Sequence, residues 1–369
     1  MTPTARRRSP WLLPAELVLS AVVSTTLFAW SGQEFVWVLG GLAAGWAATA
    51  AFRRWSGPQA PDARTRKTGQ VLVGVSLGPV LAAQSLGSAA SSLPLLLGAV
   101  VVVLAGSVLV ARAYARLCGV DGLSAGLGTL PGGVGIMASV AAETGGQSSL
   151  VALLQGVRVA VVVSVVPAIL LLGGSEGGSP EAVPPVLPEG AGGYAVWAAL
   201  VVAAFGASAL ARRLGVPVAS LLGPMILGVV VALVVRLASG GEQIVELPYL
   251  HSVVGQVLLG VTVGEYLAQE SRASRRAVVG GLGGVLSTLV LSLGVAAVLT
   301  TVTPWSFLTC VLMTAPGGAP EMIVLAAATP SELQLVVVAQ LSRQIAVNAL
   351  MPLWLRLFDD RPPEPALRG

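Results

Sequence analysis

The 369-residue chain is apolar and poor in charge: 55% of its residues are hydrophobic, 10% are charged, and its mean hydropathy is +0.85. Soluble globular domains carry about 25% charged residues, so this composition excludes a soluble globular domain. The net charge of +4 comes mostly from arginines between apolar runs, where it reports membrane topology rather than a nucleic-acid surface. We therefore expect a multi-pass membrane protein embedded in a lipid bilayer.

The first element is an apolar run that follows three arginines, Arg6, Arg7 and Arg8. The run is long for a signal peptide and no small-residue cleavage site follows it, so we interpret it as a retained transmembrane helix. Later segments also have the composition of a membrane span, which needs about 20 apolar residues. The ten predicted spans lie at 11–30, 35–52, 69–88, 93–111, 150–172, 193–210, 216–235, 251–268, 278–300 and 331–355.

Two further apolar segments, 123–145 and 305–328, are rich in Gly, Pro, Ser and Thr, and each contains Pro-Gly-Gly. Proline removes a backbone donor and glycine tolerates unusual backbone angles, so each motif predicts a broken helix. Broken backbone at membrane depth is tolerated only where protein buries it or where it lines an aqueous cavity. We therefore expect two re-entrant hairpins, with paired short spanning helices as the alternative.

The two motifs belong to an internal duplication, a pattern to be sought before any other. Residues 129–170 align with 314–355 without a gap, at an offset of 316 − 131 = 185, with 15 identities in 42 positions. Residues 69–82 align with 255–268 at an offset of 186, with 9 identities in 14. The predicted organisation is a membrane repeat at 1–173, a Gly/Pro/Glu linker at 174–192 and a second membrane repeat at 193–369.

The basic residues indicate that the two repeats are inverted, because cytoplasmic loops collect Lys and Arg. If the Pro-Gly-Gly segments re-enter, each repeat has five spans, and 18 of the 21 Lys and Arg residues lie on the cytoplasmic side. The loop 53–68 is basic, whereas its counterpart 239–250 carries only two glutamates. The predicted fold is an all-α integral protein of the inner (cytoplasmic) membrane, with two inverted-topology repeats, a broken hairpin in each, and both termini cytoplasmic.

Each Pro-Gly-Gly motif is followed by an arginine inside a predicted span. Arg158 and Arg343 lie roughly 12 Å and 18 Å along their helices, at about 1.5 Å per residue. Gln155 and Gln340 precede them by three residues and so share their helix faces. One interpretation is that these side chains cap the free carbonyls of the broken hairpins. The other is an anion site, in which two guanidinium groups and nearby helix N-termini bind a carboxylate. The two roles are compatible.

The acidic residues are not duplicated with the motifs. Glu321 stands in the second motif where the first has Ile136, beside broken backbone, and it is the predicted ion-coupling residue. A salt bridge from Glu321 to Arg343 or Arg158 is the structural alternative. Glu16 and Glu265 are expected to be charges at the membrane interface.

The sequence predicts no metal site and no cofactor. His251 is the one histidine, and Cys118 and Cys310 lack the spacing of metal ligands or of a disulfide framework. No segment has the G-x-x-x-x-G-K-[ST] pattern of an ATP-driven pump.

Both repeats carry PGG…M and then Q-x-x-R followed by Pro, and this order resembles the bacterial AbrB-type membrane protein family. The second motif, PGGAPEM, is similar to the family's PGG-x-x-E-M, whereas Ile136 departs from it in the first. The resemblance implies two labels, ammonia monooxygenase and regulator of gene expression. An oxygenase needs clustered metal ligands that this chain does not offer. No segment resembles a DNA-binding domain, so an effect on gene expression would be indirect.

The sequence therefore predicts a secondary transporter of a small anionic organic solute, coupled to H⁺ or Na⁺. This step rests on analogy with transporters that build their sites from broken helices. The alternatives are a membrane sensor or regulatory protein and, less favoured, a membrane monooxygenase; the solute and any homo-oligomer are left open. The predicted solute-binding residues are Arg158, Arg343, Gln155, Gln340, Thr129, Thr314, Gly132, Gly133, Gly317 and Gly318.

Overall fold

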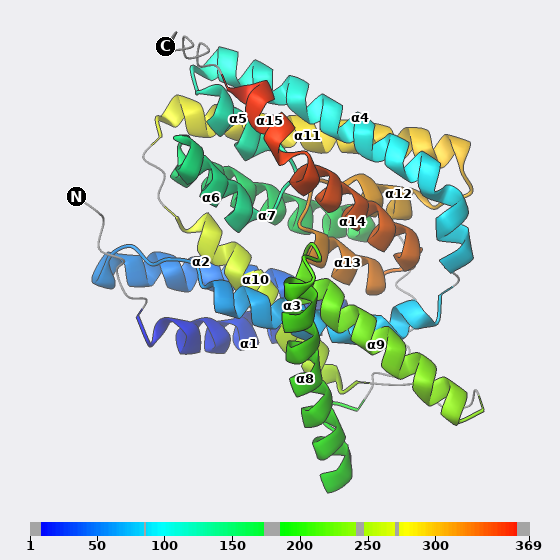
Figure 1. The fold of residues 1–369 in the computed structure, drawn as a ribbon. Helices are drawn as coiled ribbons and strands as arrows, with labels where there is room; N and C mark the ends of the chain where they lie inside the picture. Colours follow the sequence, from blue (N-terminus) through cyan, green and yellow to red (C-terminus); the bar gives the residue numbers. More distant parts are fainter. Residues whose placement is uncertain (1–8, 85, 173–184, 241–246, 270–272, 360–369) are drawn as a thin grey trace, which may run out of the picture.

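The computed structural model describes residues 9–84, 86–172, 185–240, 247–269 and 273–359, which form helices joined by turns (Figure 1). The linker prediction falls largely on 174–184, outside the described residues. The helices are α1 (Leu12–Ser31), α2 (Val36–Ser56), α3 (Ala63–Ala82), α4 (Leu86–Cys118), α5 (Gly122–Thr129), α6 (Val134–Thr144), α7 (Ser148–Leu172), α8 (Gly190–Arg213), α9 (Ala219–Ala238), α10 (Tyr249–Leu267), α11 (Arg275–Val302), α12 (Phe307–Thr314), α13 (Ala319–Ala327), α14 (Leu333–Ala349) and α15 (Met351–Phe358).

The helices pack into two bundles (Figure 1). The first bundle contains α1–α3 and α8–α10, and the second contains α4–α7 and α11–α15. The main contacts between the bundles join α7 to α10 and α2, and α3 to α13. Each bundle therefore draws helices from both halves of the sequence, and the boundary between bundles does not coincide with the middle of the chain.

Seven of the described helices are long and apolar enough to cross a membrane, and the α14–α15 pair makes an eighth if it counts as one broken span. This confirms a multi-pass membrane protein. The first span, α1, carries an exposed tryptophan at each end, Trp11 at 71% and Trp30 at 81% relative exposure. Tryptophan favours the two membrane–water interfaces, so this pair marks both ends of the span.

Two predicted spans, 35–52 and 69–88, form helices α2 and α3 that are not among the seven apolar ones. Helix α3 begins earlier than expected because the side chain of Asp62 accepts the backbone N–H of Arg64 and caps it. Its first turns are therefore basic. Both helices lie against α10, and α3 also packs against α9, so protein rather than lipid covers much of their surface.

The predicted span 331–355 is not one straight helix. It breaks into α14 and α15, which meet at an angle of 62°. Pro352 lies in the first turn of α15 and has no N–H for a hydrogen bond to the preceding turn, which explains the break. The aligned helix of the first repeat, α7, continues through Pro167 to Leu172.

Both Pro-Gly-Gly motifs interrupt a helix as predicted. The first separates α5 from α6, and the second separates α12 from α13. Leu130 and Ala315 end the preceding helices in an extended conformation, with φ/ψ of −59°/134° and −53°/130°. The bounds of α5 and α12 differ by the alignment offset, since 307 − 122 = 185 and 314 − 129 = 185. The duplicated sequence therefore forms the same local structure twice.

Close helix packing in the first bundle depends on glycines. A Cβ atom on Gly260 of α10 would lie 2.1 Å from the backbone oxygen of Val38 on α2, and one on Gly264 would lie 2.3 Å from that of Leu42. The aligned glycines of α3 behave similarly: a Cβ on Gly74 would lie 2.5 Å from the backbone oxygen of Leu221 on α9. Small residues at intervals of four let membrane helices approach closely, so α2–α10 and α3–α9 are matched pairs.

We expect Gly260→Ala to destabilise the protein by about 1–3 kcal/mol, the usual cost of overpacking, because the added methyl meets backbone that cannot rotate away. Gly283→Ala is the control, since a Cβ there has no neighbour within 4 Å. Thermal unfolding of both purified variants in one detergent tests this. Equal midpoints for the two variants would contradict the packing described above.

Candidate functional site

The interruption in the first repeat is capped by side chains from α7. The amide of Gln155 donates to the carbonyls of Leu127 at 2.5 Å and Leu130 at 2.9 Å. The guanidinium of Arg158 donates from Nη1 to the carbonyl of Leu130 at 2.8 Å and from Nη2 to that of Gly132 at 2.9 Å. The last carbonyls of a helix have no partner within the helix, and here two buried side chains supply it.

The second repeat has the same arrangement. Gln340 donates to the carbonyls of Leu312 at 2.6 Å and Ala315 at 3.4 Å. Arg343 donates from Nη1 to Ala315 at 2.6 Å and from Nη2 to Gly317 at 3.0 Å. Arg343 also donates to the side-chain oxygen of Gln340. Every acceptor carbonyl lies 185 positions after its counterpart in the first repeat.

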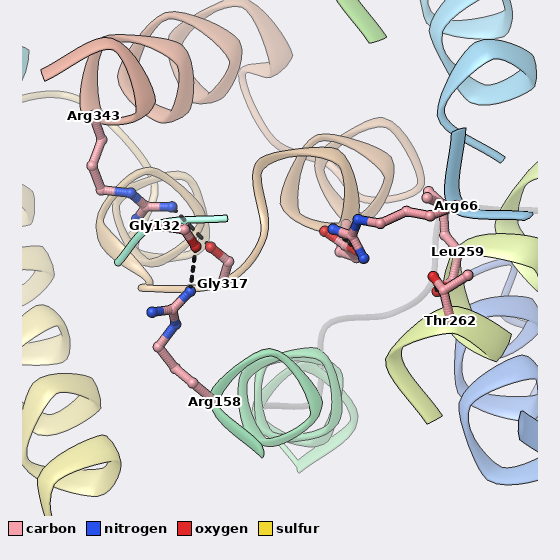
Figure 2. A network of polar contacts seen from close by, with 8 residues as sticks. Arg66, Gly132, Arg158, Leu259, Thr262, Gly317 and Arg343 are labelled. Atoms are coloured by element: carbon pink, nitrogen blue, oxygen red, sulfur yellow. Dashed lines mark hydrogen bonds and ion pairs between the residues drawn. The ribbon is translucent and has the colours of Figure 1, made fainter. Parts of the chain in front are cut away.

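The two arginines point toward one another from α7 and α14, with the carbonyls of Gly132 and Gly317 between them (Figure 2). Both side chains are buried, Arg158 at 0% and Arg343 at 3% exposure. Neither forms an ion pair with a carboxylate among the described residues. The capping role proposed from the sequence is thus present, and it places two positive charges together inside the protein.

The predicted threonines lie next to these caps, but their hydroxyl protons are used within the protein. Thr129 donates to the carbonyl of Ala125 at 2.8 Å, one turn earlier in α5. Thr314 donates to that of Cys310 at 2.8 Å and lies 3.0 Å from that of Ser292 on α11. Each hydroxyl keeps acceptor lone pairs. Their role in solute binding stays a prediction.

The glycines of the motifs have different neighbours. A Cβ on Gly132 would lie 2.0 Å from the side chain of Met137, and one on Gly317 would lie 2.9 Å from that of Met322. The methionine that follows each motif therefore packs onto its first glycine. A Cβ on Gly318 would lie 2.0 Å from the carboxylate of Glu321, whereas the nearest contact of one on Gly133 is an ordinary 3.6 Å.

Glu321 is buried at 2% exposure. It forms no salt bridge to Arg343 or Arg158, so the salt bridge considered from the sequence is wrong. Its Oε1 accepts from Nη2 of Arg66 at 3.1 Å. Arg66 lies on α3 in the first bundle and Glu321 on α13 in the second. This ion pair therefore joins the two bundles. In the sequence Arg66 is one of several basic residues before an apolar run, and only the N-cap signal of Asp62 indicates that it belongs to a helix.

Glu16 and Glu265, expected at the membrane interface, are buried among the helices, at 0% and 1% exposure. Glu16 accepts from the hydroxyl of Thr49 at 3.1 Å, and Glu265 accepts from the backbone N–H of Asp62 at 2.9 Å. Both carboxylates connect helices within the first bundle. Sequence position near the end of a span could not reveal this packing.

Two small cavities touch the site, each of about 10 Å³, which is close to the minimum for one water molecule. Thr314 and Arg343 line the first together with apolar side chains of α4, α11, α12 and α14. Glu321 lines the second with apolar side chains of α2, α7 and α13. Neither cavity is large enough for an organic solute, so the structure describes a closed site.

His251 and Cys118 lie apart from this site, whereas Cys310 lies on α12, one turn before Thr314. His251 is held between the indole N–H of Trp197, at 3.1 Å, and the carbonyl of Leu72, at 3.0 Å. Cys118 and Cys310 are free thiols. Within the described part of the chain, no group of three His, Cys, Asp or Glu residues is placed to hold a metal ion.

Comparison with known proteins assigns the family. The family model described as "Transition state regulatory protein AbrB" matches residues 37–359, nearly the whole described chain. This chain belongs to the AbrB family. The Pro-Gly-Gly interruptions and their Gln–Arg caps all lie within the matched region, so they are part of the AbrB-family portion of the molecule.

Relatives support the same assignment. The chain is 30% identical over 307 residues to "Uncharacterized protein YhjN" of Bacillus subtilis (strain 168), covering 79% of this chain and 77% of that protein. It is 26% identical over 304 residues to "Putative regulator AbrB" of Escherichia coli (strain K12), covering 80% of this chain and 83% of that one. No solved structure matches this member of the AbrB family.

We expect Arg158→Lys and Arg343→Lys to destabilise the protein. A planar guanidinium donates to two carbonyls at once, and the ammonium group of lysine cannot reproduce this geometry. Each lost hydrogen bond to a charged group costs about 1.5–3 kcal/mol. Thermal unfolding of the purified variants measures the effect. Arg236→Lys, at an exposed position in the last turn of α9, is the matched control. Unchanged midpoints in both site variants would show that the caps do not support the interrupted helices.

Proposed function

We propose that this protein is a secondary transporter of a small anionic organic solute, coupled to H⁺ or Na⁺. The observation that carries the proposal is the pair of buried arginines, Arg158 and Arg343, at the interruptions of two duplicated helices. Charged side chains inside a membrane protein are costly and generally mark a solute or ion pathway.

The charges around the interruptions do not balance. Arg66, Arg158 and Arg343 contribute +3 and Glu321 contributes −1, which leaves +2 among these four side chains. The C-terminal carbonyls of α5 and α12 offset part of this charge, since a helix C-terminus carries about half a negative charge. The remaining positive charge favours an anionic solute.

The arginines also have donors to spare. Nε of Arg158 is buried without a partner, and so is Nη1 of Arg66. A guanidinium has five N–H donors, and carboxylate and phosphate groups accept them in pairs. A small organic anion that reaches this region could satisfy the donors that the protein leaves open.

The arrangement of helices supports movement of one bundle against the other. Transporters with inverted repeats bind their solute at broken helices near the bilayer midplane and alternate its access by rocking the two parts. The predicted inversion of the repeats, the inner-membrane location and the cytoplasmic termini fit this mechanism. The cavities of about 10 Å³ beside Arg343 and Glu321 are too small for an organic solute, so solute entry in this mechanism requires a change in the packing of the bundles.

A membrane sensor or regulatory protein is the second candidate. The family description and the name of the Escherichia coli relative favour it, since both refer to regulation. The chemistry of the site suits this candidate equally well, because a sensor would bind the same anion without moving it. Flux distinguishes the two.

The test is solute-induced thermal stabilisation of the purified protein, screened over organic anions and matched neutral compounds. A ligand at roughly 100 times its Kd stabilises the folded state by about 2.7 kcal/mol. We expect a hit among the anions that is weakened in Arg158→Lys and Arg343→Lys and retained in Arg236→Lys. A hit confined to neutral compounds, or one that both site variants retain in full, would contradict an anion site at these arginines.

A further inference from the structure

The ion pair between Arg66 and Glu321 joins the two helix bundles. It links α3 to α13, and the two residues are 255 positions apart in the chain. Glu321 is at the bundle interface, where its side chain is 0% exposed, and that of Arg66 is 18% exposed. Any motion of one bundle against the other must change this contact.

The pair has no counterpart in the other half of the duplication. The position aligned with Arg66, at the offset of 186, is Ser252, and the position aligned with Glu321, at the offset of 185, is Ile136. The Gln–Arg caps are duplicated, whereas this charged contact occurs once. The Arg66–Glu321 pair is therefore an asymmetric element between two repeats whose caps are otherwise matched.

Each partner keeps one unused polar atom. Oε2 of Glu321 and Nη1 of Arg66 are both buried without a hydrogen-bond partner. The cavity of about 10 Å³ beside Glu321 is lined otherwise by apolar side chains, namely Phe35, Val38, Val163, Val324 and Leu325. One oxygen of the carboxylate is therefore bonded and the other has no hydrogen-bond partner, and the cavity beside this residue is otherwise apolar.

The charged and titratable groups around Glu321 come from several helices. Arg66 lies on α3 and Arg343 on α14, both packed against α13. Arg158 on α7 lies within electrostatic range of Glu321, and Tyr266 on α10 lies within range of both Arg66 and the carboxylate of Glu265. The titratable group on α12 is the thiol of Cys310.

We infer that the Arg66–Glu321 pair is a charge-exchange point: the anionic group of the entering solute replaces Glu321 at Arg66, and the released Glu321 takes up a proton. The inference rests on the proposed transport function and names its coupling ion. In this step the solute anion accepts hydrogen bonds from Arg66, and the proton from solution bonds to a carboxylate oxygen of Glu321. One solute charge and one proton enter together.

The surroundings of Glu321 fit a proton better than Na⁺. A metal cation needs several oxygen ligands, and the five other residues that line the cavity offer no side-chain oxygen. A proton needs only the oxygen that is already there.

The exchange also preserves charge. Arg66, Arg158, Arg343 and Glu321 carry +2 together in the closed structure. A monoanion would reduce this to +1, and protonation of Glu321 returns it to +2. Charge changes are expensive in a medium of low dielectric constant, so joint entry of the anion and the proton is favoured over entry of either alone.

The experiment uses the full-length purified protein and the infrared C=O stretch of carboxylic acids, which ionised carboxylates lack. Arg66→Gln removes the partner of Glu321 and so imitates its loss to the solute. At neutral pH in sodium-free buffer, we expect Arg66→Gln to show one carboxylic acid that Arg66→Gln/Glu321→Gln lacks. Arg66→Lys is the matched control: it keeps the charge, so Glu321 should stay ionised and the band should be absent.

Three results would overturn the inference. The first is no Glu321-dependent band in Arg66→Gln at neutral pH. The second is loss of that band when the sodium-free buffer, which contains KCl, is replaced by one that contains NaCl. That loss would show that Na⁺ binds at Glu321 instead of a proton. If Arg66→Gln does not fold, Arg66→Met is compared with Arg66→Met/Glu321→Gln at neutral pH. Absence of a Glu321-dependent band from that pair would then be the third.

The infrared measurement requires no solute, so it is independent of the transport assay. A Glu321-dependent band in Arg66→Gln together with no solute flux in the wild type would support the proton site and contradict the proposed transport function. Solute flux that is driven by a Na⁺ gradient and does not respond to a pH gradient would support transport and contradict the inference that the coupling ion is a proton.

Discussion

The structure depends on one constraint: backbone carbonyls freed inside a membrane protein must find hydrogen-bond donors, since lipid offers none. Two Pro-Gly-Gly motifs end α5 and α12 in the interior. The guanidinium groups of Arg158 and Arg343 donate hydrogen bonds to the carbonyls that these helix ends leave free. Arginine suits this task because its donors are planar and fixed in direction. It also brings a charge that the carbonyls neutralise only in part.

That residual charge connects the architecture to function. Duplication places two such arginines at facing interruptions, so the positive charges add in one region instead of being spread over the protein (Figure 2). The second bundle holds the interrupted helices, and the first contacts it through α2, α3 and α10 (Figure 1). A site of this kind, between two packed bodies with limited contacts, suits a mechanism in which their relative position opens and closes access.

Much of the local structure follows from the sequence, and most of the long-range contacts do not. The motif TLPGGVGIM predicts a helix break, and Q-x-x-R predicts a cap, because both effects act within one repeat and are set by chain chemistry. The salt-bridge partners considered for Glu321, Arg343 and Arg158, are wrong. Its partner is Arg66, which reaches it only through the packing of α3 on α13, and sequence spacing does not encode that packing. Burial of Glu265 and the limited apolarity of α2 and α3 have the same origin: neighbouring helices, not lipid, surround them.

The measurement that tests the central claim most directly is solute flux by the purified protein in sealed liposomes, with a labelled anion that stabilises it. The account predicts accumulation driven by an inward proton gradient, abolished in Arg158→Lys and Arg343→Lys variants that remain folded, and retained in Arg236→Lys. Saturable binding of the anion without any movement across the bilayer would contradict it and identify a membrane sensor built on the same pair of capped interruptions.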